Sequence, residues 1–467
     1  MNTPARKKLA MPTGESVAPE RPVGAQRMRL RYGFNEIDGW WYFSQGEQSE
    51  RIRRRLRLMG TQIIRIFVFD KPVPDPVLQW PLFAGYVQGV LDTGAVPMIT
   101  FAKYRPPYDS ERNIRTFVAR CTDIVWGCTE QWGAEVVKDW YWCIWNEPNN
   151  PLVGGNLTFE QYKRVYVEIA AAILPLLEPH LSGKKARIGG PAIDGTQRSY
   201  WMDWIARLIS EVDDRMVGFV SWHRYADWRP AAPAATLGLD LLGTAETPNG
   251  AAFEAMLMAQ TPDYEARARG VARLLYGRDI LNFCGELNTI AHHEDRYTLG
   301  LNQNVFGAAY YASALIHLLR GGAELEMRWT ATSMRWTADG EDDSYGLMNI
   351  DGDPTPACLA KQLFAQHVRY GDWVRFPLYR PENPDVDAVV AWGDNGRRSG
   401  VFVHITGGPR VVTVADWDDE LLECGTVLRI DGRTGGRVVR ELFDGTIRFD
   451  GYGVAVVSNA AGDTVLD

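Results

Sequence analysis

The chain has few cysteines, and none stands in a metal-binding arrangement. The six are Cys121, Cys128, Cys143, Cys284, Cys358 and Cys424. No two of them form the CxxC pair typical of zinc and redox sites. Cys121 and Cys128 fall on one predicted helix, where their spacing corresponds to about 10 Å, too far for a disulfide. We therefore expect reduced thiols.

Long apolar runs and basic stripes are also absent. No stretch is apolar for long enough to cross a membrane, and residues 1–27 lack the apolar core of a secretory signal peptide. This predicts a disordered tail over 1–27 and a cytoplasmic protein without a membrane partner, or a secreted one if the sequence is truncated. The net charge of −8 disfavours a nucleic-acid partner. Nothing in the pattern indicates an oligomeric state.

The familiar cofactor and nucleophile motifs are missing too. There is no Gly-rich phosphate loop and no Gly-x-Ser-x-Gly elbow. Residues 292–295 (His-His-Glu-Asp) could hold a metal, and the acidic residues 341–343 could touch Ca²⁺, but such loops are more often solvated. We expect no metal and no cofactor.

What the chain does have is length and aromatic residues. Its 467 residues exceed one ordinary core, so at least two domains are expected. The 17 Trp and 19 Tyr suit a carbohydrate site, because aromatic faces stack on sugar rings, although most of these rings are simply core.

Apolar strands alternate with helices over residues 28–370. Strands are predicted at 28–37, 63–69, 96–103, 140–145, 186–193, 216–222, 279–284 and 325–331. Helices are predicted at 49–59, 77–93, 113–132, 158–178, 199–212, 263–276, 304–320 and 355–370. This alternation predicts an α/β fold, a (β/α)₈ TIM barrel, with long insertions at about 226–262 and 332–354.

The pattern changes after residue 370. Short β-rich runs separated by Gly and Asp turns fill residues 371–467. They predict a C-terminal all-β sandwich domain. No catalytic constellation stands out in it, which indicates a packing or substrate-edge role.

The aromatic run at 140–145 ends in Asn146-Glu147-Pro148-Asn149. Because proline cannot continue a central strand, Glu147 is expected at the strand's carboxyl end. Active sites of parallel barrels lie at these ends. The alternative is a glutamate in an ordinary turn, but the flanking motif favours a functional carboxylate.

A second carboxylate, Glu286, follows the predicted seventh strand. Because the strand ends of a closed barrel face each other, we expect Glu286 to face Glu147 across the mouth. Glycoside cleavage uses two carboxyls, one to protonate the leaving oxygen and one to attack the anomeric carbon or activate water. Their separation decides between retention and inversion, and spacing along the sequence leaves it open. Glu286 could also be a structural carboxylate in a loop.

Arg65 interrupts the second apolar strand. A buried arginine is costly unless it is paired. It points either to a partly exposed face or, as we favour, into a polar site where it holds a catalytic carboxylate.

Four stretches carry a family resemblance. They are residues 145–149 (WNEPN), 188–192 (IGGPA), 219–225 (FVSWHRY) and 346–352 (GLMNIDG), the last leading into Pro356-Ala357. In order and spacing they cover nearly the whole barrel, and the chain resembles glycoside hydrolase family 39, of the clan of retaining (β/α)₈ glycosidases. The resemblance also implies the trailing β-sandwich.

The resemblance implies roles for the catalytic residues. Glu147 would be the general acid/base and Glu286 the nucleophile, with Asn146 binding the substrate 2-hydroxyl. The reaction would be double displacement on an oligosaccharide or polysaccharide, with a β-xylosidase-like or an endo-acting exopolysaccharide hydrolase as the expected type.

Four further residues are expected to bind substrate or orient the pair. Arg65 matches the clan's second-strand arginine, and His223 and Tyr225 match the sixth-strand pair, with Tyr225 beside the nucleophile. Trp329 would be the platform beneath the sugar. A lone histidine is more often structural and a lone tryptophan more often core.

The chain departs from the family at two places that would border the sugar. Leu287 stands where an aromatic is common, and the stretch at 329–332 lacks the usual acidic continuation. The sugar and the choice between exo and endo action therefore stay open. A transglycosylase using the same carboxylates and a non-catalytic carbohydrate-binding protein are the alternatives.

Overall fold

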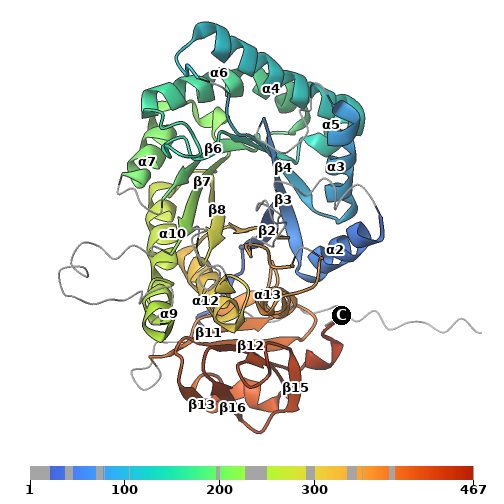
Figure 1. The fold of residues 1–467 in the computed structure, drawn as a ribbon, viewed down its shortest axis with the longest axis vertical. Coiled ribbons are helices and arrows are strands. Elements are labelled where there is room, and N and C mark those ends of the chain that lie inside the picture. The colour runs from blue at the N-terminus through green and yellow to red at the C-terminus, as the bar shows by residue number, and fades with distance from the viewer. Residues whose placement is uncertain are drawn as a thin grey trace, which may run out of the picture.

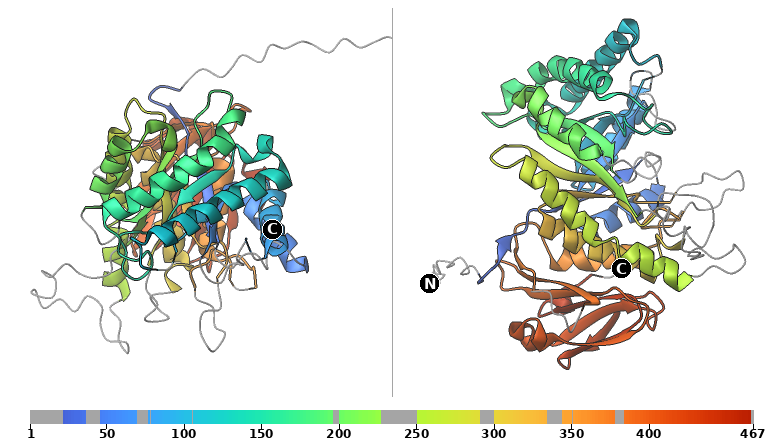
Figure 2. Two further views of the ribbon diagram at one scale, coloured as in Figure 1. Left: turned by 90° about the horizontal axis from the view of Figure 1, so that it is seen from above. Right: turned by 90° about the vertical axis from the view of Figure 1, so that its left-hand side faces the viewer.

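A computed structural model gives the fold (Figure 1). It describes residues 22–36, 46–69, 77, 79–104, 106–195, 200–226, 250–290, 300–333, 344–349, 351–377 and 384–465. Eight parallel strands close into a barrel in chain order, and helices surround it. An antiparallel β-sandwich lies beside helices α12 and α13, as Figure 2 shows from two further sides.

The barrel strands follow the predicted order. They are β2 (Arg31–Glu36), β3 (Thr61–Val68), β4 (Val96–Phe101), β5 (Tyr141–Ile144), β6 (Ile188–Asp194), β7 (Phe219–Tyr225), β8 (Leu281–Asn288) and β9 (Leu325–Trp329). Their inner faces meet in a packed layer that includes Ile63, Met98, Tyr141, Phe219 and Phe283. Because both faces of each strand are buried, the strands read as apolar runs.

Helices cover the outside of the barrel. They are α2 (Gly46–Leu58), α3 (Trp80–Asp92), α4 (Glu111–Trp132), α5 (Ala134–Val137), α6 (Phe159–Leu177), α7 (Trp201–Glu211), α9 (Gly250–Met258), α10 (Pro262–Leu274), α12 (Val305–Gly321) and α13 (Pro356–His367). Thr158 caps α6 through a capping box with Gln161. None of the described helices combines the length and apolarity needed to span a bilayer.

The sandwich contains a seven-stranded sheet in the order β1-β10-β11-β12-β17-β14-β15 and a separate pair, β13-β16. The strands are β1 (Gln26–Arg27), β10 (Trp373–Arg375), β11 (Val386–Trp392), β12 (Arg398–His404), β13 (Pro409–Thr413), β14 (Thr426–Asp431), β15 (Val439–Leu442), β16 (Thr446–Asp450) and β17 (Gly453–Ser458). One sheet face, including Val401 and Val456, joins the core of the barrel helices. The opposite face, including Phe402, packs on the β13-β16 pair. The predicted fold class is confirmed.

Several predicted boundaries are wrong. Gln26 and Arg27 are not part of a disordered tail, because they form β1 and pair with β10. Residues 223–225 and Glu286 lie inside strands β7 and β8 rather than after them. Helix α9 lies within the predicted insertion at 226–262, which stays a prediction.

Other predictions fall outside the described residues. These are most of the tail, residues 227–249 and 334–343 of the insertions, and both candidate metal loops, at 292–295 and 341–343. The prediction of reduced thiols is confirmed, since all six cysteines are free and buried.

Candidate active site

The two predicted carboxylates meet at the carboxyl end of the barrel. Glu147 follows β5 and Glu286 lies near the end of β8. One oxygen of each lies within 4.8 Å of the other, and both side chains are almost fully buried. Barrel closure brings together two residues that are far apart in the chain.

The backbone around Glu147 turns sharply out of the barrel. Trp145 and Glu147 have φ values of 75° and 46°, in the left-handed region that residues other than glycine rarely adopt. The Trp145 amide donates to the Phe101 carbonyl at 2.9 Å, and the Glu147 amide donates to the Ala192 carbonyl at 2.8 Å. Neighbouring strands therefore hold a backbone that costs roughly 1–3 kcal/mol per residue and aim the Glu147 side chain into the mouth.

The loop after Glu147 closes on it from behind. The Trp145 indole N–H donates to the Gly154 carbonyl at 2.9 Å. A Cβ at Gly154 would lie 1.7 Å from the Glu147 carbonyl oxygen, so only glycine fits there. The Asn150 amide donates to Glu147 Oε2 at 2.8 Å. Sequence reasoning missed Asn150, although it directly extends the Asn-Glu-Pro-Asn motif.

Glu286 is held by a cation and a phenol. Arg65 Nη1 donates to Glu286 Oε1 at 2.8 Å, and the Tyr225 hydroxyl donates to Oε2 at 2.8 Å. The other Arg65 amine, Nη2, donates to Asn146 Oδ1 at 2.9 Å, so one guanidinium connects the residue before Glu147 to Glu286. Arg65 thus points into the site, as we favoured.

Two residues that the sequence reasoning missed fix Arg65. Its Nε donates to the Thr100 hydroxyl at 2.8 Å, and Nη1 also donates to Asn35 Oδ1 at 3.1 Å. The Asn35 amide in turn donates to the Gly285 carbonyl at 2.9 Å, next to Glu286. Both are buried polar residues within apolar strands, the same pattern that drew attention to Arg65.

His223 lies between the two carboxyls. Its Nδ1 is 2.8 Å from Glu147 Oε1 and 3.3 Å from Glu286 Oε2, and the side chain is inaccessible to solvent. Burial lowers the pKa of His223 to about 4, so the ring is neutral near pH 7. Both carboxyl oxygens near the ring approach Nδ1 and can accept a hydrogen bond. The neutral tautomer that carries its proton on Nδ1 is therefore the one that finds an acceptor here.

The two carboxyls have unlike electrostatic environments. Burial, with a smaller contribution from the negative charge of Asp194, raises the pKa of Glu147 to about 8. Burial also raises the pKa of Glu286, and a negative charge on Glu147 adds to that rise, whereas the positive charge of Arg65 and the hydrogen bond from Tyr225 oppose it. Near pH 7 Glu147 is therefore mainly protonated, and Glu286 has a cation and a phenol ready to stabilise its ionised form.

Trp329 and Phe67 form an apolar wall beside the carboxyls. Their rings meet edge to face with centroids 5.8 Å apart, and Trp329 remains partly exposed. Leu287, by contrast, is fully buried in the core shared with the helices. The expectation that Leu287 borders the sugar site is therefore wrong, because alternation along β8 turns it away from Glu286.

The ligand atoms of Glu147, His223 and Glu286 could together hold a divalent ion. The Arg65 guanidinium, however, already places a positive charge 2.8 Å from Glu286. The residues present suit a carboxyl pair with an arginine counter-ion better than a metal centre.

Comparison with known proteins finds a curated relative and solved structures of the same fold. No protein-family model matches the chain. A curated β-xylosidase from Geobacillus stearothermophilus is 32% identical over 103 residues, which is 22% of this chain and 18% of that protein. The chain thus matches less than a fifth of that relative's length.

Solved structures match over most of both chains. A family 39 β-xylosidase from Caulobacter crescentus aligns with TM-score 0.61 and 13% identity, covering 94% of this chain and 98% of that one. A family 51 α-L-arabinofuranosidase from Bifidobacterium longum aligns with TM-score 0.63 and 14% identity, covering 93% and 98%. At these identities the likeness shows the shared fold.

Proposed function

We propose that the chain is a retaining glycoside hydrolase acting on an oligosaccharide or polysaccharide. The observation that carries the proposal is the pair of buried carboxyls with oxygens within 4.8 Å of each other. Retaining glycosidases keep their carboxyl groups about 5–5.5 Å apart, whereas inverting enzymes leave room for a water, at about 6.5–9.5 Å. The β-xylosidases among the relatives make a β-xyloside the first substrate to try.

In the first step Glu286 attacks the anomeric carbon while Glu147 gives its proton to the departing glycosidic oxygen. The C1–O bond to the leaving group breaks as the bond from C1 to the Glu286 carboxylate forms. The pKa of Glu147, about 8, keeps the acid protonated near pH 7. Arg65, 2.8 Å from Glu286, stabilises the carboxylate that must attack.

Neighbouring side chains position the substrate and the pair. Asn146, whose Oδ1 is held by Arg65, is placed to leave its amide N–H for the sugar 2-hydroxyl. Tyr225 orients Glu286 through its hydroxyl. His223 touches both carboxyls and sets their spacing. Trp329 offers its exposed surface to the apolar face of the sugar.

In the second step Glu147, now ionised, removes a proton from water, and the resulting hydroxide equivalent displaces Glu286 from C1. The product keeps the original anomeric configuration. A sugar hydroxyl in place of water would give transglycosylation by the same residues.

The test is hydrolysis of a panel of aryl glycosides and plant or bacterial polysaccharides, with Glu147→Gln and Glu286→Gln beside the unmodified protein. We expect one substrate to be cleaved with early release of the retained anomer, observed by proton NMR, and both variants to lose that activity. Release of the inverted anomer, or an active Glu286→Gln variant, would contradict the proposal. Glycan binding without turnover would instead support a binding protein.

A further inference from the structure

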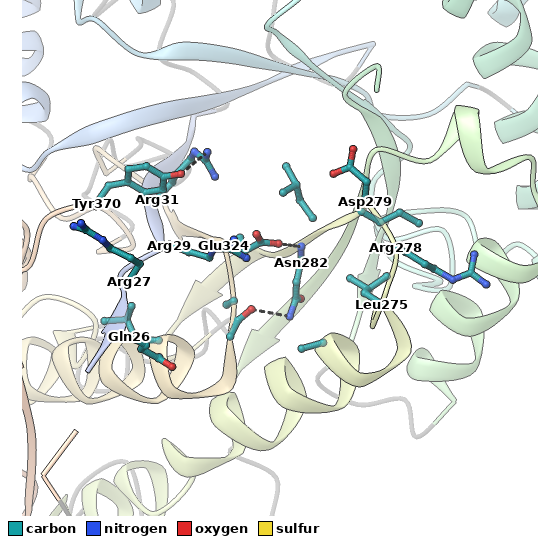
Figure 3. Close-up of a pocket in the computed structure, with 16 residues that line it drawn as sticks. Gln26, Arg27, Arg29, Arg31, Leu275, Arg278, Asp279, Asn282, Glu324 and Tyr370 are labelled. Atoms are coloured by element: carbon teal, nitrogen blue, oxygen red, sulfur yellow. Dashed lines mark hydrogen bonds between the residues drawn. The ribbon is translucent and has the colours of Figure 1, made fainter. Parts of the chain in front are cut away.

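A cavity opens at the end of the barrel opposite to Glu147 and Glu286. Its lining includes Arg31, Leu281 and Glu324, which lie at or just before the amino ends of β2, β8 and β9. Its volume is about 530 Å³, within the range of about 300–1,000 Å³ typical of small-molecule sites. Figure 3 shows the side chains that surround it.

The cavity is basic although the protein is acidic. Arg27, Arg29, Arg31 and Arg278 line it, against the two acids Asp279 and Glu324. The chain as a whole carries a net charge of −8. A local excess of arginine on an acidic protein concentrates positive potential at one place and attracts anions there.

Alternation along one extended segment produces this cluster. Met28, Leu30 and Tyr32 are almost completely buried, and the three arginines that alternate with them line the cavity. Residues two apart on an extended chain share one side, so the buried residues fix the direction of the arginines. The segment connects β1 of the sandwich to β2 of the barrel, and both ends are therefore anchored.

The three arginines differ in the contacts that their guanidinium groups already make. The Arg27 guanidinium lies 4.1 Å from the Trp373 ring centroid, and that of Arg31 lies 4.6 Å from the centroid of Tyr370. Arg29, between them, makes no hydrogen bond or ion pair with any residue that the structure describes. Burial raises the pKa of the nearby Glu324. The backbone N–H of Asn282, which donates to the Glu324 carboxylate at 3.1 Å, and the positive charges of Arg29 and Arg31 oppose that rise. The N–H donors of the Arg29 guanidinium are therefore available to a ligand.

We propose that this cavity binds a small molecule bearing an oxyanion, either a carboxylate or a phosphate. Arg29 would bind the oxyanion through its planar fork, which matches both groups in a bidentate manner. Arg31, held against Tyr370, would add a second positive charge from a preorganised position. The Tyr370 ring, 46% exposed, and Leu275 supply apolar surface for the body of the ligand.

The test is titration calorimetry on the full chain in a phosphate-free buffer of low ionic strength. Inorganic phosphate and glucuronate are the anionic probes, and glucose is the neutral control. We expect saturable binding of phosphate, glucuronate or both, but not of glucose, and weaker binding as salt is added. Whichever anion binds tighter identifies the source of the oxyanion.

Variants assign the site. Arg29→Gln should weaken binding about 10-fold or more, the scale of one charge-assisted hydrogen bond, and Arg29→Gln combined with Arg31→Gln should weaken it further. Arg215→Gln is the matched control, because Arg215 precedes β7 at the same end of the barrel, is 67% exposed and lies outside the cavity lining. All variants should hydrolyse a small aryl glycoside as the unmodified protein does, if it hydrolyses one.

Three results would overturn the proposal. They are no saturable binding of either anion, equal binding of glucose, or an equal loss of affinity in Arg29→Gln and Arg215→Gln. Because binding is measured directly, these outcomes are independent of whether the carboxyl pair at the other end is a glycosidase.

Discussion

Glu147 and Glu286 are the same residue type at the same end of the barrel, and their neighbours differentiate them. Both are buried, which raises the pKa of each. Only Glu286 has a guanidinium nitrogen and a phenol oxygen at 2.8 Å. Glu147 has an amide donor and the negative charge of Asp194 nearby. One carboxyl is thereby suited to hold a proton and the other to attack as an anion.

The proton on Glu147 predicts an alkaline limit to activity. Because its pKa is about 8, kcat/KM should fall as the pH rises through about 8 and the acid ionises. Asp194→Asn removes a charge that raises this pKa, so the alkaline limb should move to lower pH. Initial rates between about pH 5 and 10 test both statements.

The control for that profile is Glu147→Gln with an activated aryl leaving group that needs no proton. Its residual rate should lose the alkaline limb. An unchanged limb in Glu147→Gln would show that another group sets it.

Arg65 is predicted both to stabilise the negative charge of Glu286 and to hold the neighbouring side chains in position. Arg65→Met would leave the Glu286 carboxylate without its counter-ion and Thr100, Asn35 and Asn146 without their donor. We expect kcat/KM to fall by about 10²–10³-fold, the scale of one lost electrostatic contact in an active site. The acid limb should move to higher pH, because Arg65 lowers the pKa of Glu286.

Arg65→Lys is the matched variant for this prediction, because it keeps the charge and loses the fork. In Arg65→Lys the acid limb of kcat/KM should lie closer to that of the unmodified protein than in Arg65→Met, although kcat/KM itself should still fall. A Met variant with the original pH profile would exclude an electrostatic role for Arg65. Circular dichroism of both variants checks that the barrel remains folded.

At the scale of elements, the carboxyl end of β5 and its loop determine where Glu147 points. The strand ends at Ile144, and left-handed φ values at Trp145 and Glu147 turn the chain out of the barrel. Hydrogen bonds to β4 and β6 hold this turn, and the loop returns with Gly154 against the Glu147 backbone. The position of the Glu147 carboxyl therefore depends on residues whose own side chains do not face it.

Gly154→Ala is predicted to displace Glu147 without changing any polar group. The added Cβ would lie 1.7 Å from the Glu147 carbonyl oxygen, so the loop or the turn must move. Because a shift of about 1 Å can slow a reaction about 10²-fold, we expect turnover to be slower by at least roughly one order of magnitude. Kinetics with an aryl glycoside provide the measurement.

Gly408→Ala serves as the comparison, since a Cβ there meets nothing within 4 Å and its φ is ordinary. It should leave both the turnover rate and the melting temperature almost unchanged. If Gly154→Ala behaves in the same way, the close approach of the loop does not position Glu147.

At the scale of the whole molecule, the sandwich and the barrel share a core. His317 of α12 forms an ion pair with each domain when it is protonated. Its Nδ1 lies 3.1 Å from Glu265 of α10 in the barrel, and its Nε2 lies 3.5 Å from Asp387 of β11 in the sandwich. Burial disfavours the imidazolium, but the hydrogen bonds to Asp387 and Glu265 outweigh burial and raise the pKa of His317. Arg320 lies on the same cluster, 3.6 Å from Glu265.

This cluster predicts pH-dependent stability. Because the folded pKa exceeds the unfolded value of about 6.5, the stabilisation is fully present below about pH 6.5 and is lost as pH rises through the folded pKa. His317→Gln should remove this pH dependence and lower the free energy of unfolding at pH 6 by about 1–3 kcal/mol. Urea unfolding at pH 6 and pH 9 tests it, and equal pH dependence in both proteins would contradict it.

Much of the architecture could be predicted from local pattern. Apolar strands and amphipathic helices alternate clearly enough to predict the barrel, and proline after Glu147 predicted where that strand ends. The ends of β7 and β8 were less predictable, because polar residues such as His223 and Glu286 continue those strands inside the site. A polar residue in a buried strand looks like a strand end unless its partners are known.

The sequence by itself determined which residues could do chemistry and at which end of the barrel they lie. Both follow from local features, namely the apolar pattern of each strand and the proline that ends one of them. Only the tertiary structure decided that the carboxyl oxygens are within 4.8 Å, that His223 lies between them and that Asn35 and Thr100 hold Arg65. The arginine-lined cavity likewise brings residues 27–31 together with residues 275–282 and 319–324, which are far away in the sequence. Distances, burial and the pKa values that follow from them depend on which strands meet when the barrel closes, and that information is not local in the chain.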